Sequence, residues 1–236
     1  MRIIHAYFSP NGETKKIANH FHQQLGGVIV DLSLNDHELM DSISDSLLIL
    51  FCPVYSQQIP IPLRTILPLL KPKALVIMLT YGGFSYGNVL YDIKKMMKPV
   101  EVVGYAITPV KHAYIEQNIA IDFSLYHPII ERIQHEIYES TPIPYRMRNI
   151  FATFFEKKRT QYNFRLNFNR ELCTQCGLCI KHCPTHAINS MLDVSDLCIS
   201  CGHCVSVCPE KAIDQRLSLG LRIYMLQKQK TSVIVR

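Results

Sequence analysis

The chain has 236 residues, of which 48% are hydrophobic and 19% are charged, and this composition can bury the core of a globular protein. The net charge is +6, and the excess of basic residues lies in residues 141–236. Residues 1–140 hold 11 Lys or Arg against 13 Asp or Glu. The longest apolar run, residues 47–55, is too short to cross a bilayer, and the first nine residues predict a strand, so we expect a cytoplasmic protein without membrane insertion.

Strands and helices alternate through residues 1–140. Strands are predicted at residues 2–9, 28–34, 46–52, 74–80 and 101–107, and helices at 14–25, 63–70, 87–97 and 123–139. The last three strands are continuous apolar runs, as expected when helices cover both faces of a parallel sheet. Isoleucines at helical spacing in the last helix indicate core packing. They are Ile129, Ile130, Ile133 and Ile137. The pattern predicts a doubly wound α/β domain with a five-stranded parallel sheet, whose ligand lies at the carboxyl ends of the strands.

Three loops follow those carboxyl ends. The first, residues 9–15, reads Ser-Pro-Asn-Gly-Glu-Thr-Lys and leads into the first helix; the others are residues 52–60 and 80–88. Hydroxyls and backbone N–H groups at a helix N-terminus can bind phosphate. The first loop matches neither the Walker pattern nor G-x-G-x-x-G, which disfavours ATP and dinucleotides, and a turn that only caps the helix is the alternative.

A connecting segment is predicted at residues 141–170, after a Pro-rich turn at residues 140–144. Between residues 151 and 168 aromatic residues alternate with Lys157, Lys158, Arg159 and Arg165. Such a pattern can indicate nucleic-acid binding. We favour the interpretation that this segment packs the two domains together, and we do not favour nucleic acid as a partner. A third interpretation is that the segment docks an acidic redox protein.

Eight of the nine cysteines form two copies of one pattern, C-x2-C-x2-C-x3-C-P, which are 25 residues apart. This is the spacing of bacterial two-cluster ferredoxins, in which the fourth cysteine of each run ligates the other cluster. We predict two [4Fe–4S] centres within a domain at residues 171–215, followed by a tail at 216–236. The ligands of one centre are Cys173, Cys176, Cys179 and Cys208. The ligands of the other are Cys198, Cys201, Cys204 and Cys183.

Other interpretations of the cysteines are weaker. Disulfides are rare in reducing compartments, and a zinc site built from two C-x2-C pairs leaves the third cysteine of each triplet unexplained. The apolar Ile188 and Ile213 are expected to pack over the clusters. The ninth cysteine, Cys52, ends a buried strand and is interpreted as a core residue, with a redox thiol as the alternative. Oxygen-labile clusters would suit the cytosol of an anaerobe.

The loops of the first domain carry a further resemblance. The first resembles the phosphate loop of flavodoxins, and the other two resemble the loops that flank an isoalloxazine ring. The whole order resembles the bacterial and archaeal flavodoxin–ferredoxin fusion proteins, and this likeness rests on residues 53–55, 80–83, 111–114 and the cysteine repeat. It implies a flavodoxin-like five-stranded doubly wound sheet followed by a small α+β ferredoxin domain.

The resemblance also implies FMN as a cofactor. The phosphate would bind Ser9, Asn11, Gly12 and Thr14. The ring would be flanked by Pro53, Val54, Tyr55, Tyr81, Gly82 and Gly83, with Tyr86 stacking on it. Two residues depart from the flavodoxin pattern: Asn11 replaces a threonine, and Glu13 puts a carboxylate beside the phosphate.

These expectations favour an electron-transfer protein that relays electrons between two [4Fe–4S] clusters and FMN, with unidentified redox proteins as partners. One alternative is an FMN-dependent reductase of a small substrate, with His112 or a loop tyrosine as proton donor. A binding module without bound FMN is a third possibility.

Overall fold

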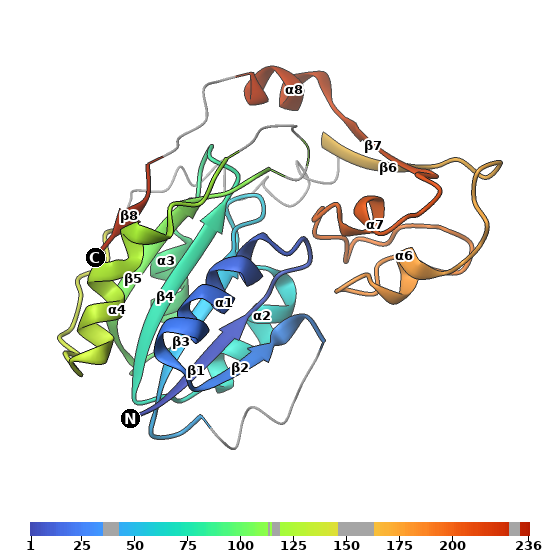
Figure 1. The fold of residues 1–236 in the computed structure, drawn as a ribbon. Coiled ribbons are helices and arrows are strands. Elements are labelled where there is room, and N and C mark those ends of the chain that lie inside the picture. The colour runs from blue at the N-terminus through green and yellow to red at the C-terminus, as the bar shows by residue number, and fades with distance from the viewer. Residues whose placement is uncertain (35–42, 113, 115–118, 146–162, 227–231) are drawn as a thin grey trace. The chain divides into compact units, whose positions relative to one another are not determined.

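The computed structural model describes residues 1–34, 43–112, 114, 119–145, 163–226 and 232–236. It divides the chain into two compact units, Met1–Arg146 with Lys230–Arg236, and Met147–Gln229 (Figure 1). Most of the predicted basic and aromatic segment, including Lys157, Lys158 and Arg159, lies outside the described residues. Among the described residues, no helix has the length and apolar character that a bilayer crossing requires.

A six-stranded sheet forms the centre of the larger unit, in the order β2-β1-β3-β4-β5-β8. Its strands are β1 (Arg2–Tyr7), β2 (Val28–Asp31), β3 (Ser46–Pro53), β4 (Ala74–Tyr81), β5 (Glu101–Pro109) and β8 (Ile234–Val235). The first five are parallel, and their order 2-1-3-4-5 is that of a flavodoxin-like doubly wound sheet. The predicted fold class is confirmed.

Helices cover both faces of this sheet (Figure 1). They are α1 (Glu13–Leu25), α2 (Ile61–Ile66), α3 (Val89–Met96) and α4 (His127–Gln134). Every residue of β3 and β4 is buried, which explains why these strands are apolar without alternation. On one face, Ile17 and Phe21 of α1 pack with Ile129 and Ile133 of α4 over the sheet.

One core prediction in this unit is wrong. The helix expected at residues 123–139 is a 3-10 turn followed by α4, which ends at Gln134. Glu136 adopts a left-handed φ of 55°, so the helical spacing is broken before Ile137. Ile137 is consequently 43% exposed, whereas Ile129, Ile130 and Ile133 are buried as expected.

The end of the chain adds a strand that the sequence pattern did not predict. β8 pairs antiparallel with β5, with Val235 opposite Ala106, and two hydrogen bonds of 2.9 Å join the backbones of Tyr105 and Arg236. Val235 also packs against the core. The backbone N–H of Thr141 donates to Val102 O at 2.7 Å, farther along the same strand. Together these segments cover the edge of β5 that would otherwise be open to pairing.

The smaller unit contains the antiparallel strands β6 (Phe164–Phe168) and β7 (Ile213–Leu217) and the helices α6 (Leu178–Lys181), α7 (His203–Ser206) and α8 (Leu219–Met225). Its cysteine repeat is also a repeat of backbone conformation. Left-handed φ angles recur at an offset of 25 residues, in the pairs Gln175 and Ser200, Gly177 and Gly202, and His186 and Lys211. The two cysteine runs therefore follow the same path in space.

Candidate functional site

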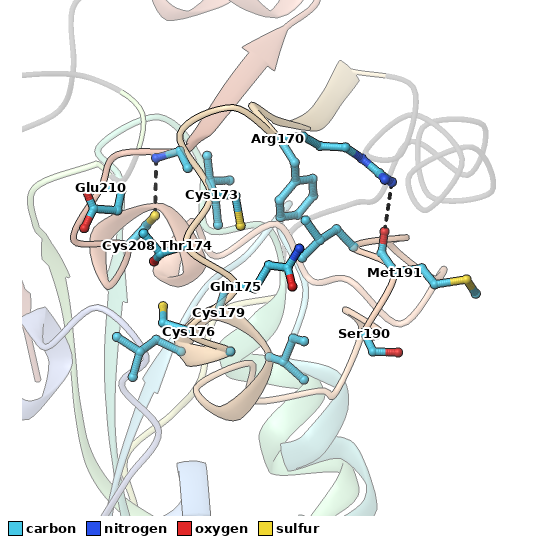
Figure 2. Close-up of a pocket in the computed structure, with 17 residues that line it drawn as sticks. Arg170, Cys173, Thr174, Gln175, Cys176, Cys179, Ser190, Met191, Cys208 and Glu210 are labelled. Carbon is cyan, nitrogen blue, oxygen red and sulfur yellow. Dashed lines mark hydrogen bonds between the residues drawn. The ribbon is translucent and has the colours of Figure 1, made fainter.

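A cavity of about 380 Å³ opens beside α6 in the smaller unit (Figure 2). Its wall brings together three cysteines of the first run and the fourth cysteine of the second run. They are Cys173, Cys176, Cys179 and Cys208. This is the crossed ligand set that the spacing predicts for one centre.

Local backbone geometry presents these thiols to the cavity. Gly177 has a φ of 72° at the start of α6, and no heavy atom lies within 4 Å of the position that a Cβ would take. Such a conformation is costly for other residues, so glycine allows the turn between Cys176 and Cys179. The Cys208 Sγ accepts a hydrogen bond of 3.3 Å from the backbone N–H of Ala212 (Figure 2).

The other four predicted ligands also interact with one another. Burial raises the pKa values of Cys198, Cys201 and Cys204, and the nearby Cys183 thiolate raises them further. For Cys201 and Cys204 the pKa reaches about 12. Thiols crowded in this way resist ionisation, and a bound cation would compensate the negative charge of their thiolates.

The two sets lie next to each other. Cys179 of the first set contributes to the raised pKa of Cys204 in the second. Ile188 and Ile213, which are 4% and 5% exposed, form an apolar cluster with Cys204 that Cys179 also contacts. This places both isoleucines beside cysteines of the repeat, and their packing over the clusters stays a prediction.

Hydrogen bonds to sulfur are a part of the site that the sequence pattern does not predict. The backbone N–H of Ala187 donates to Cys183 Sγ at 3.2 Å, and the equivalent N–H of Ala212 donates to Cys208 Sγ. The only sequence signal is the Ala-Ile pair repeated four residues after each crossing cysteine. Because the donor is the backbone, the residue type alone does not reveal it.

In the larger unit, the first predicted flavin loop is ordered by its own polar groups. Ser9 Oγ accepts a 3.0 Å hydrogen bond from Lys15 N, and Ser9 O accepts one of 3.2 Å from Gly12 N. Gly12 has a φ of 81°, and the space where a Cβ would project is open. Thr14 Oγ1 lies 2.7 Å from Thr80 Oγ1, which links this loop to the end of β4. An open N-terminus of α1 results, and this geometry fits a phosphate.

Glu13 forms an ion pair along α1. Its carboxylate lies 2.6 Å from Lys16 Nζ, one turn away on the helix. The sequence left open whether this carboxylate points toward a bound phosphate or away from it. Its charge is partly neutralised by Lys16, which reduces the repulsion that a phosphate would meet.

The second and third loops pack against each other. Val54 N donates to Thr80 O at 2.7 Å, which extends the contact between β3 and β4 by one residue. A Cβ on Gly87 would lie 2.9 Å from the Gln57 side chain, so the loop backbones meet closely. The rings of Tyr81 and Tyr86 contact edge to face at a centroid distance of 5.4 Å. The predicted flavin residues thus gather at the carboxyl ends of β1, β3 and β4.

His112 packs directly on Gly82, since a Cβ at Gly82 would lie 2.0 Å from the imidazole ring. The backbone N–H of Tyr114 donates to His112 Nδ1 at 3.2 Å, so the neutral ring carries its proton on Nε2. Burial lowers the pKa of His112 to about 4. The ring is neutral at pH 7 and is therefore a weak candidate for the proton donor of a reductase.

Cys52 has the environment of a core residue. It is fully buried, burial raises the pKa of its thiol, and its Sγ lies 3.4 Å from Pro53 O. A buried, protonated thiol is a poor nucleophile and a poor metal ligand.

Comparisons with known proteins give different kinds of match, a family model for the cysteine repeat and solved flavodoxin structures. A family model described as a 4Fe-4S binding domain matches residues 166–189 and again residues 193–214. A short-chain flavodoxin associated with a non-canonical PDU bacterial microcompartment is 15% identical, with a TM-score of 0.42, and the match covers 57% of this chain and 97% of that one. A flavodoxin mutant from Fusobacterium nucleatum, bound to flavin mononucleotide, is 18% identical with a TM-score of 0.37, over 58% and 94% of the two chains. A comparison with curated proteins finds no match.

The organisation of the chain rests on its own strand order and on the family match. The parallel order 2-1-3-4-5 is flavodoxin-like, and the 4Fe–4S model matches each half of the cysteine repeat. The chain therefore joins a domain with a flavodoxin-like strand order to a 4Fe–4S binding domain.

Proposed function

We propose that this protein transfers electrons between two [4Fe–4S] clusters and an FMN bound to its flavodoxin-like domain. The observation that carries the proposal is the meeting of Cys173, Cys176 and Cys179 with the distant Cys208 at one cavity. A ferredoxin with crossed ligands requires this arrangement, whereas two independent zinc ribbons do not.

The ligands of the first cluster are the four cysteines of this cavity. The second cluster is ligated by Cys198, Cys201, Cys204 and Cys183, whose mutual influence on thiol pKa supports a shared site. The backbone donors at Ala187 and Ala212 hydrogen-bond the crossing sulfurs. Cys179 packs against the apolar cluster that contains Cys204, which supports a short electron path between the two sites.

FMN would bind at the carboxyl ends of β1, β3 and β4. Its phosphate is assigned to Ser9, Asn11, Gly12 and Thr14 at the start of α1. Its ring is assigned to the loops that contain Pro53, Val54, Tyr55, Tyr81, Gly82, Gly83 and Tyr86. A flavin exchanges electrons singly or in pairs, whereas a 4Fe–4S cluster exchanges them singly, so the protein would connect these two kinds of chemistry.

The residues of the chain have defined tasks in this scheme. The open left-handed turn at Gly12 leaves room for a phosphate beside the N-terminus of α1, and Lys16 offsets the charge of Glu13. Ile188 and Ile213 exclude water between the cysteine sets. Low polarity and hydrogen bonds to sulfur both set a cluster's potential.

Anaerobic purification followed by analysis of iron, sulfide and flavin tests the proposal. We expect about eight iron and eight sulfide per chain, which is two cubes, together with one FMN. Cys176→Ser should lower the iron content, whereas Cys52→Ala, the matched control outside the repeat, should leave it unchanged. Tightly bound zinc without sulfide, at about two ions per chain because each structural zinc takes four ligands, would refute the cluster assignment.

A second measurement separates a relay from a reductase. Stopped-flow reduction of the flavin after reduction of the clusters should proceed without any small substrate. Turnover of a small organic acceptor in the absence of a partner protein would instead favour the reductase alternative.

A further inference from the structure

The cysteine repeat contains a natural comparison between the two cluster sites. Thr185 and Glu210 occupy equivalent positions, 25 residues apart, each two residues after a crossing cysteine and directly after its proline. The backbone around them is the same, since His186 and Lys211 both have a φ of 50°. A hydroxyl therefore replaces a carboxylate at an otherwise repeated position.

At Cys183 the sulfur has two neighbouring donors. It accepts the N–H of Ala187 at 3.2 Å, and Thr185 Oγ1 lies 3.7 Å away, within hydrogen-bond range for sulfur. A thiolate has no proton to give, so when it is a ligand the hydroxyl must be the donor.

At Cys208 the second donor is missing from the corresponding position. The sulfur accepts the N–H of Ala212 at 3.3 Å, which matches the bond at Cys183. Glu210 stands where the threonine would be and lines the same cavity as Cys208 (Figure 2). Its ionised carboxylate accepts hydrogen bonds and cannot donate one to sulfur.

These two groups act oppositely on an anionic cluster. Reduction adds negative charge to the cluster, so a donor to a ligand sulfur stabilises the reduced state and raises the potential. A nearby carboxylate repels the added electron and lowers the potential. An exposed carboxylate at the rim of a cavity acts through water, which makes its effect modest but measurable.

We propose that Thr185 and Glu210 are potential-tuning residues, with Thr185 raising the potential of the cluster that Cys183 ligates and Glu210 lowering that of the cluster that Cys208 ligates. The inference rests on the two clusters of the proposed function. The contribution of each residue is the difference in cluster potential between the variant and the parent protein. Other differences between the two sites are the same in both proteins and therefore cancel.

The test compares matched variants of the full holoprotein. Thr185→Val removes the hydroxyl at nearly constant shape, and Thr185→Ser keeps it. Glu210→Gln removes the charge, and Asp214→Asn removes an exposed charge of the same unit that does not line the cavity. The potential of each cluster is measured anaerobically by redox titration, followed by electron paramagnetic resonance and by the proton signals of the cysteine methylene groups.

At a fixed solution potential, we expect Thr185→Val to lower the ratio of reduced to oxidised cluster by about threefold at one site. A threefold change is about 28 mV for one electron, given about 59 mV for a tenfold change. Glu210→Gln should raise the ratio by about two- to threefold at the other site. Glu210→Thr should raise it more, because it adds a donor as well. Thr185→Ser and Asp214→Asn should stay near the parent.

Three results would overturn the inference, provided that iron and sulfide contents match the parent. They are unchanged potentials in Thr185→Val and Glu210→Gln, a shift of both variants at the same cluster, and a shift of either variant in the opposite direction. A parent protein that binds no iron and sulfide would refute the proposed function itself, which is a separate and directly measured outcome.

Discussion

Replacing Gly82 by Ala should disrupt the loop that is expected to flank the flavin ring. A Cβ at this position would lie 2.0 Å from His112 Cδ2 and 2.9 Å from Cγ and Nε2, where ordinary contact begins at 3.4 Å. The imidazole must therefore recede by about 1.4 Å. Gly82 does not have a left-handed φ, so the substitution tests the steric clash without backbone strain.

The magnitude follows from two losses. Overpacking a filled site costs about 1–3 kcal/mol. Moving the ring also stretches the hydrogen bond from Tyr114 N to His112 Nδ1, and such a bond contributes about 1 kcal/mol. We expect Gly82→Ala to lower the free energy of unfolding of the larger unit by about 2–4 kcal/mol.

A double-mutant cycle isolates the contact. His112→Ala should be destabilising alone, because it empties a buried site, but Gly82→Ala in that background should cost little, since the clashing ring is gone. The double variant should then be about 2 kcal/mol more stable than the sum of the single effects implies. Urea unfolding followed by far-UV circular dichroism measures the three variants, and FMN titration of the same proteins reports on the loop.

Gly220→Ala is the matched control for this cycle. It makes the same chemical change in α8 of the smaller unit, where nothing lies within 4 Å of the new Cβ and the φ is not left-handed. It should be neutral or slightly stabilising. A Gly82→Ala protein as stable as the parent, or single effects that simply add, would show that the Gly82–His112 contact does not constrain this loop.

Three further predictions concern the larger unit. Burial of His5, whose Nδ1 has no partner among the described residues, lowers its pKa from 6.5 to about 4. Between these two pH values the unfolded state therefore binds more protons than the folded state. The contribution of the neutral His5 to stability is complete above about pH 6.5 and is lost as the pH falls toward 4. Between pH 7.5 and 5 the parent should thus lose about 2 kcal/mol more than His5→Gln, as measured by urea unfolding, and equal losses would contradict this origin. Deleting residues 232–236 should expose the edge of β5 and speed amide hydrogen exchange at Tyr105, whose N–H donates to Arg236 O. Exchange at Leu79, inside the buried β4, should not change. Unchanged exchange at Tyr105 would argue against the pairing of β8 with β5. Lys16→Gln should weaken FMN binding about two- to threefold, because it leaves the Glu13 charge unpaired, whereas Glu13→Gln should strengthen binding. Fluorescence titration with FMN at low salt measures both affinities, and affinities equal to that of the parent would contradict the prediction.

Local sequence patterns predicted much of this protein. The apolar runs of β3 and β4 and the helical spacing of Ile17 and Phe21 identified the sheet and its covering helices, because burial on two faces or on one face imposes those patterns directly. The error at Ile137 arose where periodicity continued past the helix end. A left-handed residue at Glu136 stopped the helix there, although its side chain gives no such signal.

The cysteine repeat is the strongest example of what the sequence by itself determined. Ligand type and spacing are chemical requirements of a 4Fe–4S cluster, so the motif had to be visible in the chain. Even the crossing of Cys208 to the first run follows from the motif, and the cavity brings these cysteines together.

The tertiary structure alone decided the contacts that depend on the backbone or on distant neighbours. The pairing of β8 with β5 uses main-chain groups, which every residue carries. The hydrogen bonds to sulfur at Ala187 and Ala212, the Thr14–Thr80 link and the packing of His112 on Gly82 likewise join groups whose partners no local pattern identifies. The identity of the side chains thus determines which cofactor can bind. The hydrogen bonds to the ligand sulfurs and the covering of the sheet edge depend instead on which backbone groups folding brings into contact.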